Sequence, residues 1–432
     1  MNREPIVVGL DIGTTKICVI VARRQGDRFE VLGMGHADSL GVQRGMISNI
    51  ERTVDSIERA VKQATEASQV EIREVFVGIA GQHIRSMQHR GLLVRKDGES
   101  EISAEDIRQL TDDMHKMVVN PGDRIIHVLP QEFIVDNEPN IKDPVGMCGV
   151  RLEANFHIIT GQISAAQNIL RCVNKCGLHL KELILEPLAS AAAVLDEEEK
   201  EAGVVLVDIG GGTTDVAIFH DHIIRHTCVI PFGGNVITDD IIEGCRVTRD
   251  QAEKLKRRFG SAIASAEMDN QIISIPGIRG RPAKEISVRN LANIINARME
   301  EILELVDDEI ERSGFKRKLV AGMVITGGGA QLKNLVQLAE YVTGLGTRIG
   351  IPTEYLAPMP GDELKHPMYS TCVGLVINGY RHYAQQPSLQ PTDEAAESSG
   401  SPRKEKGNRI QNLMDRLLGG VKGILLDEVI DK

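Results

Sequence analysis

Residues 207–215 read VDIGGGTTD, and residues 9–16, much earlier in the chain, read GLDIGTTK. In both stretches an apolar run ends in Asp-Ile-Gly, a turn with two threonines follows, and a second apolar run begins. This pattern predicts a β-hairpin, and its repetition predicts an internal duplication. We therefore expect an α/β fold with two similar domains, whose hairpins face each other across a cleft.

The two hairpins have the chemistry that suits the phosphates of a nucleotide. Glycine lets the backbone approach phosphate oxygens closely, successive N–H groups form an anion site, and threonine hydroxyls add donors. Asp11 and Asp208 each end a strand, where they can hold Mg²⁺ through water, and Lys16 can reach a phosphate as a point charge. Neither hairpin matches a P-loop or a dinucleotide-binding fingerprint. The alternative is two turns that only reverse the chain, and the repeated pattern argues against it.

A third glycine-rich stretch, VITGGGAQ at residues 324–331, follows an apolar strand and precedes a predicted helix. Three glycines at Gly327, Gly328 and Gly329 would let a planar base or a phosphate lie against the backbone at a helix N-terminus. A single such triplet is a weak signal. Here it is the third member of a set, which favours a nucleotide site.

Hydrophobic periodicity predicts the elements of the remaining chain. Between residues 83 and 160 polar residues dominate, and this segment is expected to form an inserted α+β unit, in which Ser103 and Asp106 open a helix with a capping box. The pattern predicts strands over residues 5–10, 16–23, 29–33, 75–80, 125–128, 132–135, 156–160, 204–208 and 323–326, and helices over residues 51–68, 248–259, 287–313 and 371–383.

The composition limits the class of protein. A chain of 432 residues corresponds to about three domain-sized units. Aromatic residues are only 3 % and the net charge is -11, which argues against nucleic acid as a partner. Seven scattered cysteines without a CxxC pair fit a reducing cytosol, and Cys172 and Cys176 are expected to be buried thiols rather than metal ligands. The chain shows no leader peptide and no apolar run long enough to span a membrane, so we expect a soluble cytoplasmic body.

The last part of the chain has a different composition. Residues 385–407 are rich in proline, serine and charge, which predicts a flexible linker. Residues 408–426 then have an apolar stripe at helical spacing beside basic residues, as in helices that bind anionic membrane surfaces. The alternative is a helix that docks on the body or on a partner. The stripe comprises Ile410, Leu413, Met414, Leu417, Leu418, Val421, Ile424 and Leu425, and the basic residues are Arg409, Arg416 and Lys422.

The three glycine sites and two further segments, EPLASAAA at residues 186–193 and YSTCVGL at residues 369–375, resemble the superfamily of actin, heat-shock chaperones and sugar kinases. All five stand in the order found in that superfamily. RIIHVLPQEFI at residues 124–134, with four other stretches, is most similar to the FtsA family of bacterial cell-division proteins. The other four are NIKDPVGMCGV at 140–150, LVDIGGGTTDV at 206–216, RHTCVIPFGGNV at 225–236 and GIRGRP at 277–282.

This resemblance implies a two-lobed actin-like ATPase that binds ATP with Mg²⁺ and turns it over weakly if at all. It also implies a protein that polymerises on the cytoplasmic face of the inner membrane at the division septum. There it would anchor the FtsZ ring, recruit later divisome proteins, and use the tail to hold anionic lipid. A chaperone-type ATPase would need a substrate domain after residue 384, and a sugar kinase would have no linker and tail.

The resemblance also assigns domains. Residues 1–82, 161–195 and 346–384 would form the first lobe, 83–160 the inserted subdomain, and 196–345 the second lobe. A smaller subdomain at about residues 230–300 would bind FtsZ, and the insert would take part in self-association.

Site residues follow by position in the family motifs. Glu186 would orient the water that attacks the γ-phosphate, and Asp215 is expected to begin a strand rather than serve chemistry. Glu253 and Lys256 would contact the ribose and base, although a solvated charged helix face explains them equally well. The phosphate and adenosine motifs comprise Asp11, Gly13, Thr14, Thr15, Lys16, Asp208, Gly210, Gly211, Gly212, Thr213, Thr214, Gly327, Gly328 and Gly329.

Overall fold

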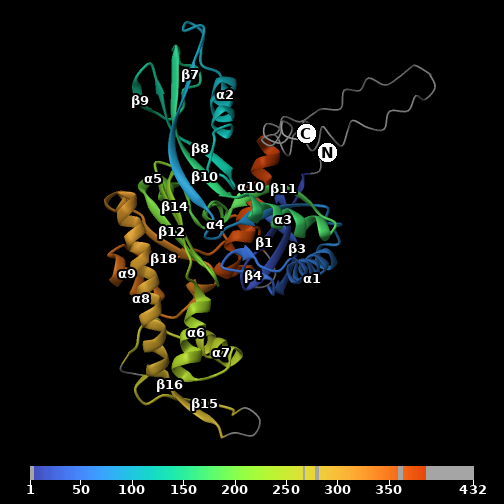
Figure 1. Ribbon diagram of the computed structural model, residues 1–432, viewed down its shortest axis with the longest axis vertical. Coiled ribbons are helices and arrows are strands. Elements are labelled where there is room, and N and C mark those ends of the chain that lie inside the picture. The colour runs from blue at the N-terminus through green and yellow to red at the C-terminus, as the bar shows by residue number, and fades with distance from the viewer. Residues whose placement is uncertain (1–3, 266–267, 278–281, 359–362, 386–432) are drawn as a thin grey trace, which may run out of the picture.

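The computed structural model describes residues 4–265, 268–277, 282–358 and 363–385. Two five-stranded sheets lie in the middle of the molecule, a smaller sheet projects from one end, and a helical unit occupies the other (Figure 1). The predicted linker and amphipathic helix, residues 385–407 and 408–426, lie outside the described residues except for Gln385. Among the helices of the described ranges, none is long and apolar enough to cross a membrane.

The first sheet has the strand order β11-β6-β1-β2-β3, and β1 and β2 form its hairpin. Successive side chains along its strands point to opposite faces and enter two different hydrophobic cores, so that Val7 packs on one face and Val8 on the other. Helices α1 (Ile50–Ser68) and α3 (Ile163–Lys175) cover one face, and α4 (Glu186–Val194) and α10 (Ser370–Gln385) cover the other. The strands are β1 (Ile6–Ile12), β2 (Lys16–Gln25), β3 (Arg28–Asp38), β6 (Glu74–Ile79) and β11 (His179–Leu185), with a small ribbon of β4 (Val42–Gln43) and β5 (Met46–Ile47) beside them.

The second sheet repeats the topology of the first. Its order is β14-β13-β12-β17-β18, with β12, β13 and β14 antiparallel in sequence and β17 and β18 parallel to β12. The first sheet has the same pairings when β12 is matched to β1 and β17 to β6, so the predicted duplication is confirmed. The strands are β12 (Val204–Ile209), β13 (Thr214–His220), β14 (Ile223–Ile230), β17 (Gly322–Thr326) and β18 (Thr347–Ile349).

Helices and a small ribbon complete this half of the molecule. The predicted helix over residues 287–313 is observed as α8 (Val288–Ser313), with Ser287 as its N-cap and a left-handed Gly314 at its end. A capping box of Thr248 and Gln251 begins helix α7. Besides α8 there are α5 (Glu197–Ala202), α6 (Gly234–Cys245), α7 (Arg249–Phe259), α9 (Leu335–Thr343), β15 (Ile272–Ile275) and β16 (Lys284–Ser287), and 3-10 turns at Lys316–Lys318, Gly328–Gln331, Glu363–Lys365 and Pro367–Tyr369.

One expected boundary needs correction. The second lobe was expected to end at residue 345, but β18 pairs with β17 and therefore belongs to the second sheet. The chain rejoins the first sheet at Leu356, which forms a bridge to Phe29. The second lobe thus extends to Ile349, because a short parallel edge strand follows α9 before the chain crosses back.

The insert forms a four-stranded sheet of order β7-β10-β8-β9, with helix α2 packed on it. The capping box of Ser103 and Asp106 is present as predicted. The two strands predicted over 125–128 and 132–135 are a single strand, because a bulge at Gln131 lets the ladder continue past Pro130. The elements are β7 (Arg85–Val94), α2 (Ala104–His115), β8 (Asp123–Val135), β9 (Glu138–Ile141) and β10 (Arg151–Gln162).

The chain leaves and re-enters the first lobe through α4 and α10, which pack against each other between the two sheets. Pro187 occupies the first turn of α4, where its missing N–H costs nothing, and a run of alanines follows. The contact is so close that a Cβ on Gly374 would lie 1.7 Å from the backbone oxygen of Ala189. Only glycine fits at this point of the α10 helix.

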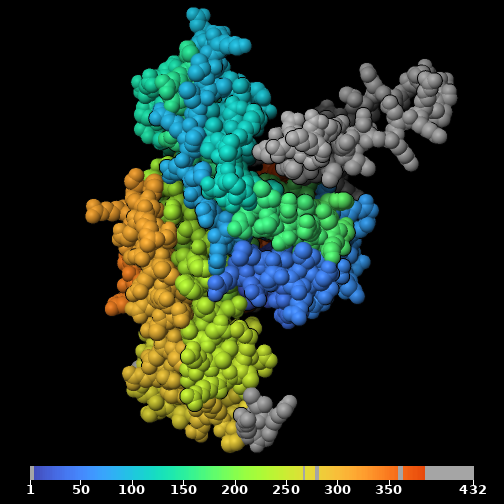
Figure 2. Space-filling model, in the orientation of Figure 1, coloured from blue at the N-terminus to red at the C-terminus, as the bar shows by residue number. Residues whose placement is uncertain are grey.

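The insert also touches the second lobe. Ser86 donates to the carbonyl of Thr227 over 3.1 Å, and the Gln131 side chain donates to the carbonyl of Ile224 over 2.8 Å. His157 and the hydroxyl of Thr227 are 3.1 Å apart. Figure 2 shows the insert projecting from the rest of the molecule above this contact. The insert is therefore joined to the first lobe by the chain and to β14 by hydrogen bonds.

Candidate functional site

The two hairpins face each other, as the sequence predicts, and their turns are in direct contact rather than separated by the expected cleft. A Cβ on Gly211 would lie 2.3 Å from Cγ2 of Thr15, and one on Gly212 would lie 2.7 Å from Oγ1 of Thr14. The turn of the second hairpin is closed by a hydrogen bond from the Gly210 N–H to the Thr213 carbonyl, 2.9 Å. Glycine is required here because any side chain would hold the hairpins apart.

Carboxyl groups gather behind these turns. Asp11 lies near the end of β1, Asp208 lies near the end of β12, Asp215 lies on β13, and Glu186 begins α4. Burial raises the pKa of Asp11 to about 6 against the opposing effect of Lys16, and it raises the pKa of Asp215 to about 8 with help from Asp208. Burial and the three aspartates raise the pKa of Glu186 well above its ordinary value. The pKa of Asp208 is also raised by burial.

The partners of these carboxyls come from both crossing helices. Oδ2 of Asp208 accepts from Ser190 on α4 over 2.6 Å and from Thr371 on α10 over 3.3 Å. Asp215 accepts from Thr213 over 3.1 Å, but its Oδ1 is buried without a hydrogen-bond partner. A buried carboxylate oxygen without a hydrogen-bond partner is costly, and a nearby cation or a bound proton would stabilise it.

The positive charge of Lys16 acts on both Asp11 and Asp208 and opposes the rise of their pKa values. Its ammonium donates to the carbonyl of Met368 over 2.6 Å and lies 3.9 Å from the centre of the Tyr369 ring. One ammonium does not balance four carboxyl groups. Hard oxygen ligands with a surplus of negative charge are the ligands that Mg²⁺ prefers, so the residues fit the predicted metal.

Asp215 is the site residue that sequence reasoning missed. It does begin a strand as expected, but it also pairs directly with Asp208 across the β12–β13 ladder. The corresponding partner of Asp11 in the first hairpin is Cys18. The signal was available in the sequence, because a tight turn places the two aspartates of VDIGGGTTD opposite each other.

The raised pKa of Asp215 makes a prediction for the nucleotide-free protein. Folding raises this pKa from 3.8 to about 8, so between these values the folded state holds a proton that the unfolded state has released. Stability must therefore fall as the pH rises through this window. In Asp215→Asn the unfolding midpoint should fall less between about pH 6 and about pH 8 than in the wild type. Thermal unfolding in EDTA tests this, with Asp27→Asn at an exposed position as the control; parallel curves for Asp215→Asn and wild type would contradict it.

The third glycine stretch lies against the second hairpin. Gly327 has a φ of 85°, and a Cβ there would lie 2.3 Å from Oδ1 of Asp208; a Cβ on Gly329 would lie 2.4 Å from Ile209. The prediction of an adjoining helix N-terminus is wrong in one respect. The glycines enter a four-residue 3-10 turn, and α9 begins only at Leu335, because Leu332 to Asn334 leave helical geometry.

Glu253 and Lys256 are more than a solvated helix face. Lys256 donates to the Gly234 carbonyl and to Thr238, each over 2.7 Å, and pairs with Glu253 over 2.8 Å. The Gly234 N–H in turn donates to the Gly210 carbonyl of the second hairpin over 2.9 Å. Burial lowers the pKa of Lys256, and the charge of Lys256 lowers the pKa of Glu253 against the effect of burial. The structure thus links both residues to the second hairpin.

Other predicted residues have simpler outcomes. Cys172 is buried as expected, whereas Cys176 is half-buried; both face α1, where their thiols contact the carbonyls of Ile50 and Val54. The eleven predicted membrane residues between Arg409 and Leu425 lie outside the described residues.

The chain matches two domain families. The family described as cell division protein FtsA matches residues 205–374, and the SHS2 domain inserted in FtsA matches residues 81–160, which are the insert.

Solved structures show the same fold at low identity. The PilM–PilN type IV pilus biogenesis complex has a TM-score of 0.64 at 14 % identity, covering 88 % of this chain and 99 % of that one. MreB5 of Spiroplasma citri bound to ADP has a TM-score of 0.53 at 16 % identity, covering 88 % and 98 %. The fold is therefore that of the actin-like ATPases.

Curated relatives agree with these domains over nearly the whole length. Cell division protein FtsA of Pseudomonas aeruginosa is 40 % identical over 407 residues, covering 94 % of this chain and 96 % of that protein. FtsA of Escherichia coli K12 is 36 % identical over 392 residues, covering 89 % and 91 %. The hairpins, the insert and this similarity together place the chain in the FtsA family of cell division proteins.

Proposed function

We propose that this protein binds ATP with Mg²⁺ at its two facing hairpins and, in that state, assembles on the inner membrane as the anchor of the FtsZ ring. The observation that carries the nucleotide part is the cluster of Asp11, Asp208 and Asp215 beneath two glycine turns in contact. The fold neighbour MreB5 was solved bound to ADP, which supports nucleotide binding by this chain as well.

In this proposal each group has a role. Backbone N–H groups of the two hairpins bind phosphate, with Lys16 adding positive charge. Asp11, Asp208 and Asp215 hold Mg²⁺ through water, which neutralises phosphate charge. Glu253 and Lys256 approach the ribose and base beside the second hairpin, and Gly327, Gly328 and Gly329 receive the adenosine. The Mg²⁺ ligands lose their protons when the ion binds.

Turnover is proposed to be slow because of Glu186. We propose that this residue orients the attacking water, and in the absence of a bound ion burial and three neighbouring aspartates raise the pKa of Glu186 well above its ordinary value. A protonated carboxyl group cannot accept a proton from the attacking water, and it does not orient that water as a carboxylate would. We therefore propose that ATP acts mainly as a ligand that joins the lobes, and that hydrolysis is weak.

The proposed partners are assigned to separate parts of the chain. Residues of about 230–300, which include α6, α7 and β15, are proposed to bind FtsZ, and the insert to contact a second copy or later divisome proteins. The lobes are proposed as first expected, with the second ending at Ile349. The tail, residues 408–426, is proposed to bind anionic lipid on the cytoplasmic face at the septum. Avidity from self-assembly would strengthen a weak single helix.

Deletion of residues 408–432 tests the membrane part. We expect the truncated protein to lose co-sedimentation with anionic vesicles and to keep its affinity for ATP, because the body contains both hairpins.

A matched pair of full-length variants separates the contribution of apolar contact from that of charge. Leu417→Glu on the apolar stripe should weaken vesicle binding at least about tenfold, since burial of a leucine contributes about 1.5–3 kcal/mol. Asn412→Glu, with the same charge change on the other face, should weaken it much less; unaltered pelleting of the truncated chain would overturn the assignment.

A further inference from the structure

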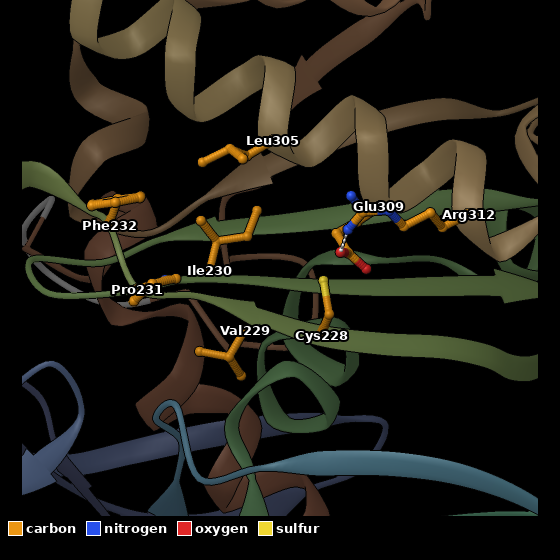
Figure 3. Close-up of a pocket in the computed structure, with 8 residues that line it drawn as sticks. All are labelled: Cys228, Val229, Ile230, Pro231, Phe232, Leu305, Glu309 and Arg312. Carbon is orange, nitrogen blue, oxygen red and sulfur yellow. Dashed lines mark hydrogen bonds and ion pairs between the residues drawn. The ribbon is translucent and has the colours of Figure 1, made fainter.

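The pocket between β14 and α8 contains a group of side chains that the nucleotide site does not use. His226 and Cys228 are two residues apart on β14, so their side chains leave the same face of the strand. Glu309 lies on α8, which packs over that face. Figure 3 shows the Cys228 sulfur pointing from the strand toward the Glu309 carboxylate on the helix.

These three side chains bring three different ligand atoms together. One nitrogen of His226, the sulfur of Cys228 and one carboxylate oxygen of Glu309 all lie within 4.8 Å of one another. Nε2 of His226 is 3.3 Å from Oε2 of Glu309. In a tetrahedral zinc site with bonds of about 2.0–2.3 Å, ligand atoms are separated by about 3–4 Å, so a small inward movement would suffice.

Neighbouring side chains orient the three ligand groups and leave them accessible to solvent. The Arg312 side chain donates to Oε1 of Glu309 over 2.6 Å, so Oε2 faces His226 and Cys228. Side chains of His226 and Glu309 keep 24 % and 23 % of their exposure, so an ion and a water can reach them. The pocket beside them has a volume of about 200 Å³ and is lined on its other side by Ile230, Phe232 and Leu305.

We propose that His226, Cys228 and Glu309 form a binding site for a transition-metal ion, with Zn²⁺ the favoured ion and water as the fourth ligand. Nitrogen, thiolate and carboxylate are the ligand types that Zn²⁺ takes in proteins, and three protein ligands leave one position open. The thiolate favours Zn²⁺ over Mg²⁺ and Ca²⁺, which prefer oxygen. The site is independent of the proposed nucleotide function, which neither needs nor excludes it.

Metal binding would require Cys228 to lose its proton. Without a metal, burial and then the negative charge of Glu309 raise the pKa of Cys228, so the thiol keeps its proton and pairs with the carboxylate. A bound Zn²⁺ would reverse this balance, because two positive charges stabilise the thiolate and the carboxylate together. The metal would join β14 to the long helix α8. The neighbouring residues on the other face of β14, among them Thr227, contact the insert.

Cobalt substitution tests the site on the full-length protein, with Mg²⁺ and ATP present at saturation to occupy the oxygen-rich cleft. We expect one equivalent of Co²⁺ to give a thiolate-to-cobalt charge-transfer band and the strong visible bands of four-coordination, and Zn²⁺ to displace it. Cys228→Ser should abolish the charge-transfer band. Cys148→Ser, at an exposed cysteine of the insert, is the matched control and should leave the spectrum unchanged.

Two further variants keep the proposal testable if Cys228→Ser folds poorly. Glu309→Gln and His226→Gln should each weaken Zn²⁺ binding at least tenfold by calorimetry, while circular dichroism confirms that each is folded. Zn²⁺ should raise the unfolding midpoint of the wild type and of Cys148→Ser, but not of these variants. A wild-type protein without the charge-transfer band, or a band that survives in Cys228→Ser, would overturn the proposal. Zn²⁺ affinities of Glu309→Gln and His226→Gln that both equal the wild-type affinity would also overturn the proposal.

Discussion

Asp208→Asn should lower the affinity for ATP by about 10- to 100-fold in the presence of Mg²⁺, while leaving the much weaker affinity in EDTA nearly unchanged. Asparagine has the same shape and can still accept from Ser190 and Thr371, but it removes one negative charge beside the proposed ion. An interaction with a charged group contributes about 1.5–3 kcal/mol, and each 1.4 kcal/mol is a factor of ten. Titration with a fluorescent ATP analogue, with and without Mg²⁺, measures both affinities.

The same substitution should not destabilise the nucleotide-free protein. The charge of Asp208 raises the pKa of Glu186 and Asp215, so its removal relieves repulsion among buried carboxyls. A midpoint of unfolding equal to or above that of the wild type would show that lost affinity does not reflect lost folding. Ser190→Ala, which removes a hydrogen bond of Asp208 but no charge, serves as control and should cost far less affinity. Equal affinity and equal Mg²⁺ dependence in Asp208→Asn and wild type would refute the proposed cleft.

Gly374→Ala should lower the free energy of unfolding by about 3 kcal/mol or more, although it adds one methyl group. The new Cβ would lie 1.7 Å from the Ala189 oxygen and 2.3 Å from its carbonyl carbon, both of which are backbone atoms of α4. Neither atom can turn aside as the end of a side chain could. Overpacking of a core costs about 1–3 kcal/mol, and more where the backbone has to shift. Urea unfolding monitored by circular dichroism gives the difference.

Gly346→Ala is the matched control for this substitution. No heavy atom lies within 4 Å of a Cβ at Gly346, and its φ is not in the left-handed region. Its effect should therefore stay within about 0.5 kcal/mol, as for other surface substitutions. If Gly374→Ala were as stable as Gly346→Ala, α4 and α10 could separate at little cost, contrary to the packing described here.

The duplicated sheets were predictable because their signal is local. Each hairpin motif occupies fewer than ten consecutive residues, and the residues that form its turn do not depend on packing against distant parts of the chain. The helix caps at Ser103, Thr248 and Ser287 were predictable for the same reason, since a cap involves residues three apart.

Features that depend on partners distant in sequence were not found. The strand through Pro130 continues because Asn155 and Phe156 on β10 accommodate a bulge, which the sequence of β8 alone does not reveal. The edge strand β18 is only three residues long and exists because β17 lies beside it. The pairing of Asp208 with Asp215 is different, because both lie in one hairpin whose register could have been predicted from its tight turn. The site at His226, Cys228 and Glu309 joins residues from two elements that only the fold brings together.

The attachment of the insert to both lobes has a mechanical consequence. Strands β7 and β10 anchor it covalently beside the first sheet, while Ser86, Gln131 and His157 tie it to β14 of the second. If the lobes rotate about α4 and α10, the insert must either break these ties or swing with the second lobe. Because it projects from the body of the molecule (Figure 2), it would act as a lever in such a rotation. A few degrees of rotation at the cleft would become a much larger displacement at its tip.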